Sequence, residues 1–217
     1  MDYFLLPETT KVRRIIPKNT FDSYTNGQQK KLFSDKIARI TWVQKISKET
    51  VNLPSNEINE IQIFKIELKV KEFVSAILAI IDKSIPYHIV FIVEYGDEIY
   101  LSTSKKHPNP AHENTSVIDW TFRSEWFLPA NRKYRLNLKQ NIDAVFKDIC
   151  LQLLGRDDLA NQSINSIIHT QQQIDTLQRE INNLKSSIKN TKQFNRKVEL
   201  NVLLKTKEAE LASYRIS

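Results

Sequence analysis

The sequence predicts an α+β fold. A body at 1–158 would hold a mixed or antiparallel sheet of about five or six strands flanked by helices, and 159–217 would form an antiparallel helical hairpin (coiled coil). Two observations carry this prediction. Up to position 123, short runs rich in Ile, Val, Phe and Tyr alternate with segments of helical apolar spacing. From Asn161 to Ser217 there is neither Gly nor Pro, and apolar residues recur at heptad-like intervals.

The first half of the body alternates strand and helix signals. The strand signals are KVRRII, which Pro17 ends, then ITWV, VNLP and EIQIFKIELKV, the strongest of them. The helix signals are QKKLFSDKIARI and FVSAILAIIDKS, the second of which Pro86 ends. The apolar faces of these two helices would be formed by Leu32, Phe33, Ile37 and Ile40, and by Phe73, Ile77, Ile80 and Ile81.

The second half of the body contains a hairpin signal. HIVFIVEY and EIYLSTSKK flank the dipeptide Gly96-Asp97, a pattern typical of two strands joined by a tight turn. HPNPAHENT is expected to be a loop because its two prolines lie close together. SVIDWTFRSEWF returns as a strand, and NIDAVFKDICLQLL indicates a helix that Gly155 caps.

The tail indicates two helices. One seam of the first helix is almost continuously apolar, and it is formed by Ile167, Thr170, Ile174, Leu177, Ile181, Leu184 and Ile188. A second helix, from about Phe194 to Arg215, can cover this seam with Leu200, Leu204, Leu211 and Tyr214. The second helix has another apolar side, formed by Val198, Val202, Ala209 and Ile216. Because one partner helix needs only one apolar side, the second side is expected to dock on the body, on a second copy or on a foreign protein.

Composition narrows the class of protein. The formal charge is +7, from 32 basic and 25 acidic residues, which permits contact with nucleic acid or an acidic protein surface. No window approaches the roughly 18 apolar residues of a membrane span, and the start lacks the pattern of a signal peptide, so we expect a cytoplasmic protein without membrane contact. A single Cys150 excludes an internal disulfide, and three glycines leave no room for a Gly-rich phosphate loop. We predict no cofactor.

The sharpest enzymatic candidate is Glu67-x-Lys69, at the end of the strongest strand. Metal-dependent nucleases of the PD-(D/E)xK type place such a pair there, because carboxylates hold Mg²⁺ and the lysine stabilises charge near the attacked phosphate. No well-placed Asp precedes the pair, since Glu57 and Glu60 lie before the same strand. A solvent-facing strand end is the preferred interpretation.

Two further clusters contain residue types found in metal sites and nucleic-acid interfaces. His107, His112 and Glu113 lie in a Pro-rich segment without the helical spacing of a zinc pair, so no metal site is predicted. The cluster formed by Arg132, Lys133, Tyr134 and Arg135 combines cations with an aromatic ring and could meet phosphates and stack a base. We prefer the interpretation that the tyrosine packs on the body and the cations are solvated.

Several stretches together resemble the bacterial family designated domain of unknown function 4391. They are RIIPK, KKLFSDKIARITWVQKISKETVNLP, EIQIFKIELK, KSIPYHIVFIVEY and FRSEWF, which occur in this order over most of Tyr3 to Gly155. KQFNRKVELN also resembles the C-terminal arms of that family. The resemblance implies no established activity and no catalytic residues. It implies an accessory component encoded near helicases and DNA methyltransferases in restriction-like or phage-defence loci.

The sequence therefore favours a non-catalytic adaptor that docks on a protein partner, of helicase or DNA methyltransferase type, with nucleic acid contacted directly or through that partner. The predicted partner-binding residues are Ile167, Ile174, Leu177, Ile181, Leu184, Ile188, Val198, Val202, Leu204 and Leu211. Two alternatives stay open. One is a PD-(D/E)xK-like nuclease, or a DNA-binding module derived from one, that uses Glu67 and Lys69. The other is a homodimeric coiled-coil structural protein whose arms pair between chains.

Overall fold

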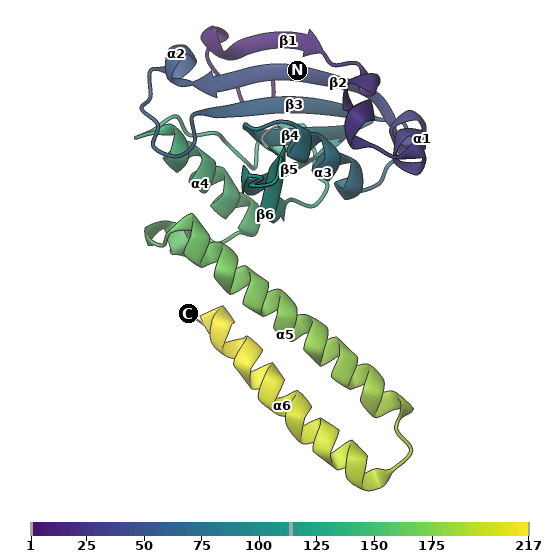
Figure 1. Ribbon diagram of the computed structural model, residues 1–217. Coiled ribbons are helices and arrows are strands. Elements are labelled where there is room, and N and C mark those ends of the chain that lie inside the picture. Colours follow the sequence, from purple (N-terminus) through teal and green to yellow (C-terminus); the bar gives the residue numbers. More distant parts are fainter. Residues whose placement is uncertain (1, 113–114, 217) are drawn as a thin grey trace. The chain divides into compact units, whose positions relative to one another are not determined.

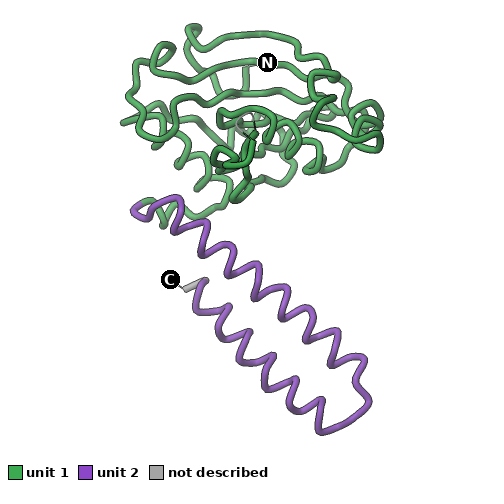
Figure 2. The backbone as a smooth tube through the Cα atoms, viewed as in Figure 1, with its two compact units in different colours: residues 1–160 green, residues 161–217 purple. Residues whose placement is uncertain are grey.

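The computed structural model describes residues 2–112 and 115–216. The chain divides into two compact units, Met1–Ala160 and Asn161–Ser217, which we call the body and the arm (Figure 2). The body is α+β, as the sequence predicts, and the arm consists of helices (Figure 1). Among the described residues, no helix combines the length and the apolarity that crossing a membrane requires.

Six strands of the described chain form one mixed sheet, whose spatial order follows the sequence from β1 to β6 (Figure 1). The strands are β1 Lys11–Ile15, β2 Ile37–Ser47, β3 Glu60–Leu68, β4 His88–Tyr95, β5 Glu98–Pro108 and β6 Ser116–Arg123. Neighbouring strands are antiparallel except β3 and β4, which are parallel and are joined through a helix. The hairpin predicted around Gly96 is confirmed: this residue has φ +59° in the turn between β4 and β5.

The helices of the body begin and end at recognisable residues. They are α1 Gly27–Lys36, α2 Lys48–Val51, α3 Ser75–Ser84 and α4 Ile142–Leu154, with short 3₁₀ turns at Glu8–Thr10, Lys18–Tyr24, Pro129–Asn131 and Asp157–Asn161. Asn26 and Gln29 form a reciprocal capping box at the start of α1. Asn141 caps the start of α4, and Gly155, at φ +68°, ends it in the left-handed conformation that the sequence predicts.

Two predicted elements of the body are wrong. Ile37 and Ile40 lie on β2, not on a helical face, because α1 ends at Lys36. A register shift between Ile37 and Arg39 lets both isoleucines face the same core, which imitates the spacing of a helix. VNLP is not a strand, since α2 ends at Val51 and Asn52 turns the chain with φ +53°.

One face of the sheet holds the main apolar core. Residues paired in parallel register point to the same face, so Phe64 of β3 lies beside Phe91 of β4, with ring centroids 6.3 Å apart. Both pack in a cluster with Phe33 of α1 and with Ile77 and Ile81 of α3. The intervening residues of β3 and β4 therefore point to the opposite face.

The opposite face is partly covered by α4. Phe146 of α4 meets the ring of His88 edge-on, with centroids 4.5 Å apart. Asp143, in the first turn of α4, accepts backbone hydrogen bonds from Asn56, Glu57 and Ile58 at 2.8, 3.0 and 3.0 Å. These bonds lower the pKa of Asp143, although burial opposes them. They tie α4 to the loop that precedes β3.

A buried ion pair joins α3 to β5. The Nζ of Lys106 donates to Oδ1 of Asp82 at 2.7 Å, and also to the backbone oxygens of Asp82 and Ile85. Both charged side chains are 1% exposed. Burial raises the pKa of Asp82 and lowers that of Lys106, while their mutual attraction acts in the other direction on each. Three acceptors satisfy the three donors of an ammonium group, so the geometry is that of a protonated lysine.

The arm contains two long helices, α5 Ile164–Asn190 and α6 Phe194–Ile216. Ser163 caps the start of α5 by accepting from the amide of Ser166. The two helices pack on each other through Leu177, Ile181 and Leu211. Polar contacts flank this cluster: Tyr214 donates to Gln173 at 2.8 Å, Lys207 pairs with Glu180 at 3.0 Å, and Lys185 pairs with Glu208 at 2.9 Å.

Candidate functional site

The predicted partner-binding residues of the arm fall into two sets. Five of the ten face the contact between α5 and α6. Leu177, Ile181 and Leu211 are buried there, and Ile174 and Leu204 pack against them. Leu184 and Ile188 are half-buried, and Ile167 is buried. Val198 and Val202 form the second set, because their side chains are 48% and 61% exposed.

The exposed set extends beyond the two valines. Phe194 is 78% exposed, and with Val198 and Val202 it follows the i, i+4, i+8 spacing of one helical side. We call these three residues the stripe. Leu200 and Leu211, which are buried, lie on the other side of α6. Leu203, 46% exposed, lies next to the stripe in the sequence, and neither it nor Phe194 was predicted as a contact residue. Ala209 is also exposed, whereas the side chain of Ile216 lies outside the described residues.

Basic residues surround the connection between α5 and α6. Lys189, Lys192 and Lys197 make no ion pair within the described parts of the chain, whereas Arg196 pairs with Glu199 at 2.7 Å. This end of the arm therefore presents an excess of positive charge beside the stripe.

Glu67 and Lys69 are engaged by different partners. The carboxylate of Glu67 lies 3.9 Å from Arg39 and 3.8 Å from Lys65, both on the sheet. The Nζ of Lys69 instead donates to the backbone oxygen of Ser34 in α1, at 2.6 Å. Within residues 2–112 and 115–216, no three His, Cys, Asp or Glu side chains are grouped closely enough to hold a metal ion. Glu67 and Lys69 therefore connect the end of β3 to β2 and α1.

The basic cluster near Tyr134 is split between core and surface. Tyr134 is 6% exposed and packs edge-on against Phe127, with ring centroids 5.1 Å apart. Its amide donates to the hydroxyl of Tyr3 at 3.2 Å. Arg132, Lys133 and Arg135 are exposed. The ring that could have stacked a base is thus buried in the body, and only the three cations face solvent.

Of the two histidines His107 and His112, the first has a local partner. His107 belongs to β5, and its Nδ1 lies 2.8 Å from a carboxylate oxygen of Asp119 on β6. His112 is exposed in the loop that follows. Glu113 lies outside the described residues.

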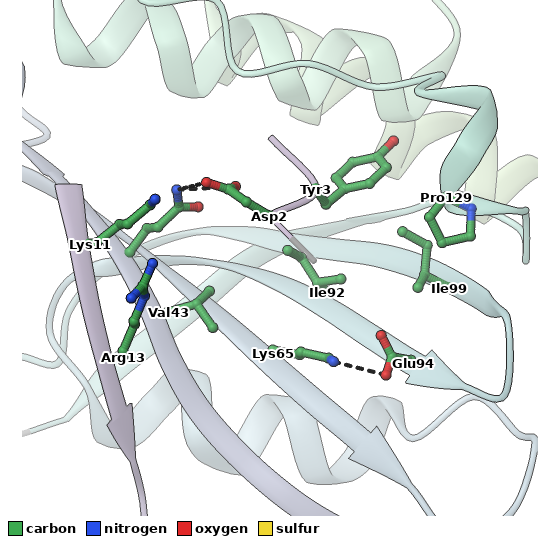
Figure 3. Close-up of a pocket in the computed structure, with 11 residues that line it drawn as sticks. Asp2, Tyr3, Lys11, Arg13, Val43, Lys65, Ile92, Glu94, Ile99 and Pro129 are labelled. Atoms are coloured by element: carbon green, nitrogen blue, oxygen red, sulfur yellow. Dashed lines mark hydrogen bonds and ion pairs between the residues drawn. The ribbon is translucent and has the colours of Figure 1, made fainter. Parts of the chain in front are cut away.

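A pocket of about 480 Å³ opens on the sheet face opposite α3 (Figure 3). Its lining comes from segments far apart in the sequence: Asp2, Tyr3, Lys11, Arg13, Val43, Gln44, Lys65, Ile92, Glu94, Ile99 and Pro129. The sequence did not indicate this pocket. The one available signal was charge at two inward positions of adjacent strands, Lys65 in β3 and Glu94 in β4.

Most polar groups of the pocket are paired. Lys65 binds Glu94 at 2.8 Å, and the carboxylate of Asp2 accepts from the Gln44 amide at 3.1 and 3.2 Å (Figure 3). Lys11 pairs with Glu8, which lowers the pKa of that carboxyl. Arg13 is exposed and makes neither a hydrogen bond nor an ion pair with any described residue. Its backbone has φ +55°, a left-handed conformation that is rare for a non-glycine residue.

A family model described as Domain of unknown function (DUF4391) matches residues 4–211. The chain belongs to this family. The match to DUF4391 covers nearly the whole chain, so it spans the body and most of the arm. No curated protein and no solved structure matches the chain. The DUF4391 description states no activity.

Proposed function

We propose that this protein is a non-catalytic adaptor, that α5 and α6 form an antiparallel helical hairpin (coiled coil) within one chain, and that the stripe on α6 docks on a partner protein. The observation that carries the proposal is the division of apolar residues on α6. Leu200 and Leu211 are buried, while Phe194, Val198 and Val202 remain exposed. A surface helix that packs on one neighbour needs a single apolar side. The second, exposed apolar side of α6 indicates a surface that binds another molecule.

The proposed occupant of the stripe is an amphipathic helix of a foreign protein, with acidic residues along its edges. An apolar stripe at i, i+4, i+8 spacing matches the recognition of one helix by another. The acidic edges follow from charge complementarity with Lys189, Lys192 and Lys197, which lack ion-pair partners among the described residues. The family resemblance favours a helicase or DNA methyltransferase of a restriction-like or phage-defence system as the source of that helix.

Burial of the stripe can supply part, but not all, of the free energy that binding a partner requires. Full burial of a Val or Phe side chain stabilises a complex by about 1.5–3 kcal/mol, so the three stripe residues Phe194, Val198 and Val202 together contribute roughly 4.5–9 kcal/mol. Association costs about 4–15 kcal/mol before any affinity appears. Loss of one stripe residue should therefore weaken binding strongly. Replacing a stripe residue with aspartate should weaken binding further, because it brings an unpaired charge into the contact.

The test compares three full-length proteins: the wild type, Val198→Asp in the stripe, and Asn183→Asp as a control at an exposed position of α5. Each is used as bait in a lysate of the source organism, and bound proteins are quantified by mass spectrometry. A partner retained by the wild type and by Asn183→Asp, lost by Val198→Asp, and bound again by the wild type when purified supports the adaptor. Equal recovery with all three baits contradicts it.

Sedimentation of the same three proteins tests the homodimer. If the wild type and Asn183→Asp sediment as dimers and Val198→Asp as a monomer, a second copy occupies the stripe and the adaptor proposal is wrong. Circular dichroism checks that all three retain equal helix content. Because Val198 is exposed, the substitution is expected to leave the fold intact.

A further inference from the structure

The pocket on the open face of the sheet has the dimensions of a small-molecule site. Its volume of about 480 Å³ lies within the range of roughly 300–1,000 Å³ that ligand pockets occupy. Val43, Ile92 and Ile99 contribute apolar side chains from three different strands. Tyr3 and Pro129 add apolar surface, and Figure 3 shows Tyr3 across the pocket from Lys65. This apolar lining suits the body of an organic molecule.

The charged groups favour an anion at one end of the pocket. The lining carries Lys11, Arg13 and Lys65 against Asp2 and Glu94, and Glu8, which pairs with Lys11, brings the local formal charge to 3 − 3 = 0. Lys65 is neutralised by Glu94, and Lys11 by Glu8. Arg13 forms no ion pair within the described chain, although its charge helps to lower the pKa of nearby Glu8, and Figure 3 shows it reaching in from β1 beside Lys11. A guanidinium group binds carboxylate or phosphate with two parallel hydrogen bonds.

The backbone at Arg13 gives independent support. The register between β1 and β2 shifts between Lys11 and Arg14, so Arg13 occupies a bulge. At φ +55° a glycine would be unstrained, whereas an arginine there carries a steric cost. Strained residues of this kind concentrate at binding sites, where the side chain is needed at that point.

From the pocket's volume, its apolar lining and the unpaired Arg13 we infer that this site binds a small organic anion. The anionic group, a carboxylate or a phosphate, lies against Arg13 and Lys11. The apolar or aromatic body of the ligand lies over Val43, Ile92 and Ile99. This site belongs to the sheet of the body and is separate from the stripe, so it adds a ligand to the proposed adaptor and does not depend on that proposal.

The probe for this site is 8-anilinonaphthalene-1-sulfonate, an aromatic anion whose fluorescence rises in apolar surroundings. The full-length protein is titrated with the dye at pH 7, and saturable binding of one molecule is expected. In Arg13→Gly the dissociation constant should rise about tenfold, because a charged hydrogen-bonding partner is lost. The melting temperature should not fall, because the left-handed conformation suits glycine. Arg14→Ala removes an adjacent cation that does not line the pocket, and it should bind the dye like the wild type.

Two measurements distinguish this site from adventitious dye binding. Methyl NMR shifts on adding the dye should appear at Ile92 and Ile99 but not at Ile77 and Ile81, which pack on the other face of the sheet. Competition with adenosine monophosphate and with benzoate then separates a phosphate ligand from a carboxylate ligand, and displacement by either supports the site. The inference is overturned if neither displaces the dye, if Arg13→Gly and Arg14→Ala weaken binding equally, or if the shifts lie elsewhere.

Discussion

His88 should make the body acid-sensitive well above the range in which carboxylates titrate. Its side chain lies beneath α4 against Phe146, the residue is 8% exposed, and its Nε2 has no hydrogen-bond partner among the described residues. Burial lowers the pKa of His88 from 6.5 to about 3, and the nearby charges of Lys106 and Lys105 act in the same direction. Asp143 opposes them. The imidazole is therefore neutral in the folded protein at pH 5.

The magnitude follows from linkage between protonation and folding. Because the pKa is depressed in the folded state, the stabilisation is fully present above pH 6.5 and is lost as the pH falls from 6.5 toward 3. Each pH unit in this window corresponds to about 1.4 kcal/mol. Between pH 7 and pH 5 the free energy of unfolding should thus fall by about 2 kcal/mol through this residue alone.

The assay is urea unfolding at pH 7 and at pH 5, followed by tryptophan fluorescence. Trp42, Trp120 and Trp126 all belong to the body, so the signal reports the unit that contains His88. His88→Phe should remove about 2 kcal/mol of the pH dependence. His169→Phe, an exposed position in the arm, should leave the dependence unchanged. The reasoning is refuted if wild type and His88→Phe lose the same free energy between the two pH values.

Two further substitutions test the packing of the body. Asp82→Ala leaves the ammonium of Lys106 buried without its carboxylate and should reduce the free energy of unfolding by about 3–5 kcal/mol, whereas the double replacement Asp82→Leu with Lys106→Met should recover most of this loss. A single variant as stable as the wild type in a thermal melt would show that the pair is not buried. Gly155→Ala places a side chain at φ +68° and should cost about 1–2 kcal/mol. An unchanged midpoint in denaturant would contradict the left-handed cap of α4.

The sequence predicted those elements whose signals are local. The hairpin of β4 and β5 follows from two β-rich runs around Gly96, and α4 follows from its apolar period and Gly155. β2 was misread because its bulge places Ile37 and Ile40 on one face, three positions apart, as a helix would. Phe64 breaks the polar–apolar alternation of β3 because that strand is buried on both faces. Ile63 is buried on one face and Phe64 on the other.

A candidate site could be predicted from the sequence only where all its residues lie on one helix or strand. The exposed side of α6 follows from helical spacing at Val198 and Val202, and the structure adds Phe194. The pocket could not be predicted, because residues near Asp2, Lys65 and Pro129 approach one another only through the tertiary fold. The burial of Tyr134 likewise depends on Phe127 and on a distant segment near Tyr3.

The N-terminal segment, which lines the pocket with Asp2 and Tyr3, has a consequence for folding and for hydrogen exchange. Each strand of the sheet pairs with its neighbour in the sequence, so most of the sheet has low contact order and can assemble early. Tyr3 instead meets Tyr134 across 131 positions, and Asp2 meets Gln44 across 42. Because these contacts, and the packing of the Tyr3 ring on Phe127, all join positions far apart in the sequence, the segment from Asp2 to Leu6 should be the last part of the body to order. In native-state hydrogen exchange its amides should open at a lower free energy than those of β3 and β4. A ligand would then enter the pocket when the segment from Asp2 to Leu6 opens locally while the sheet stays folded.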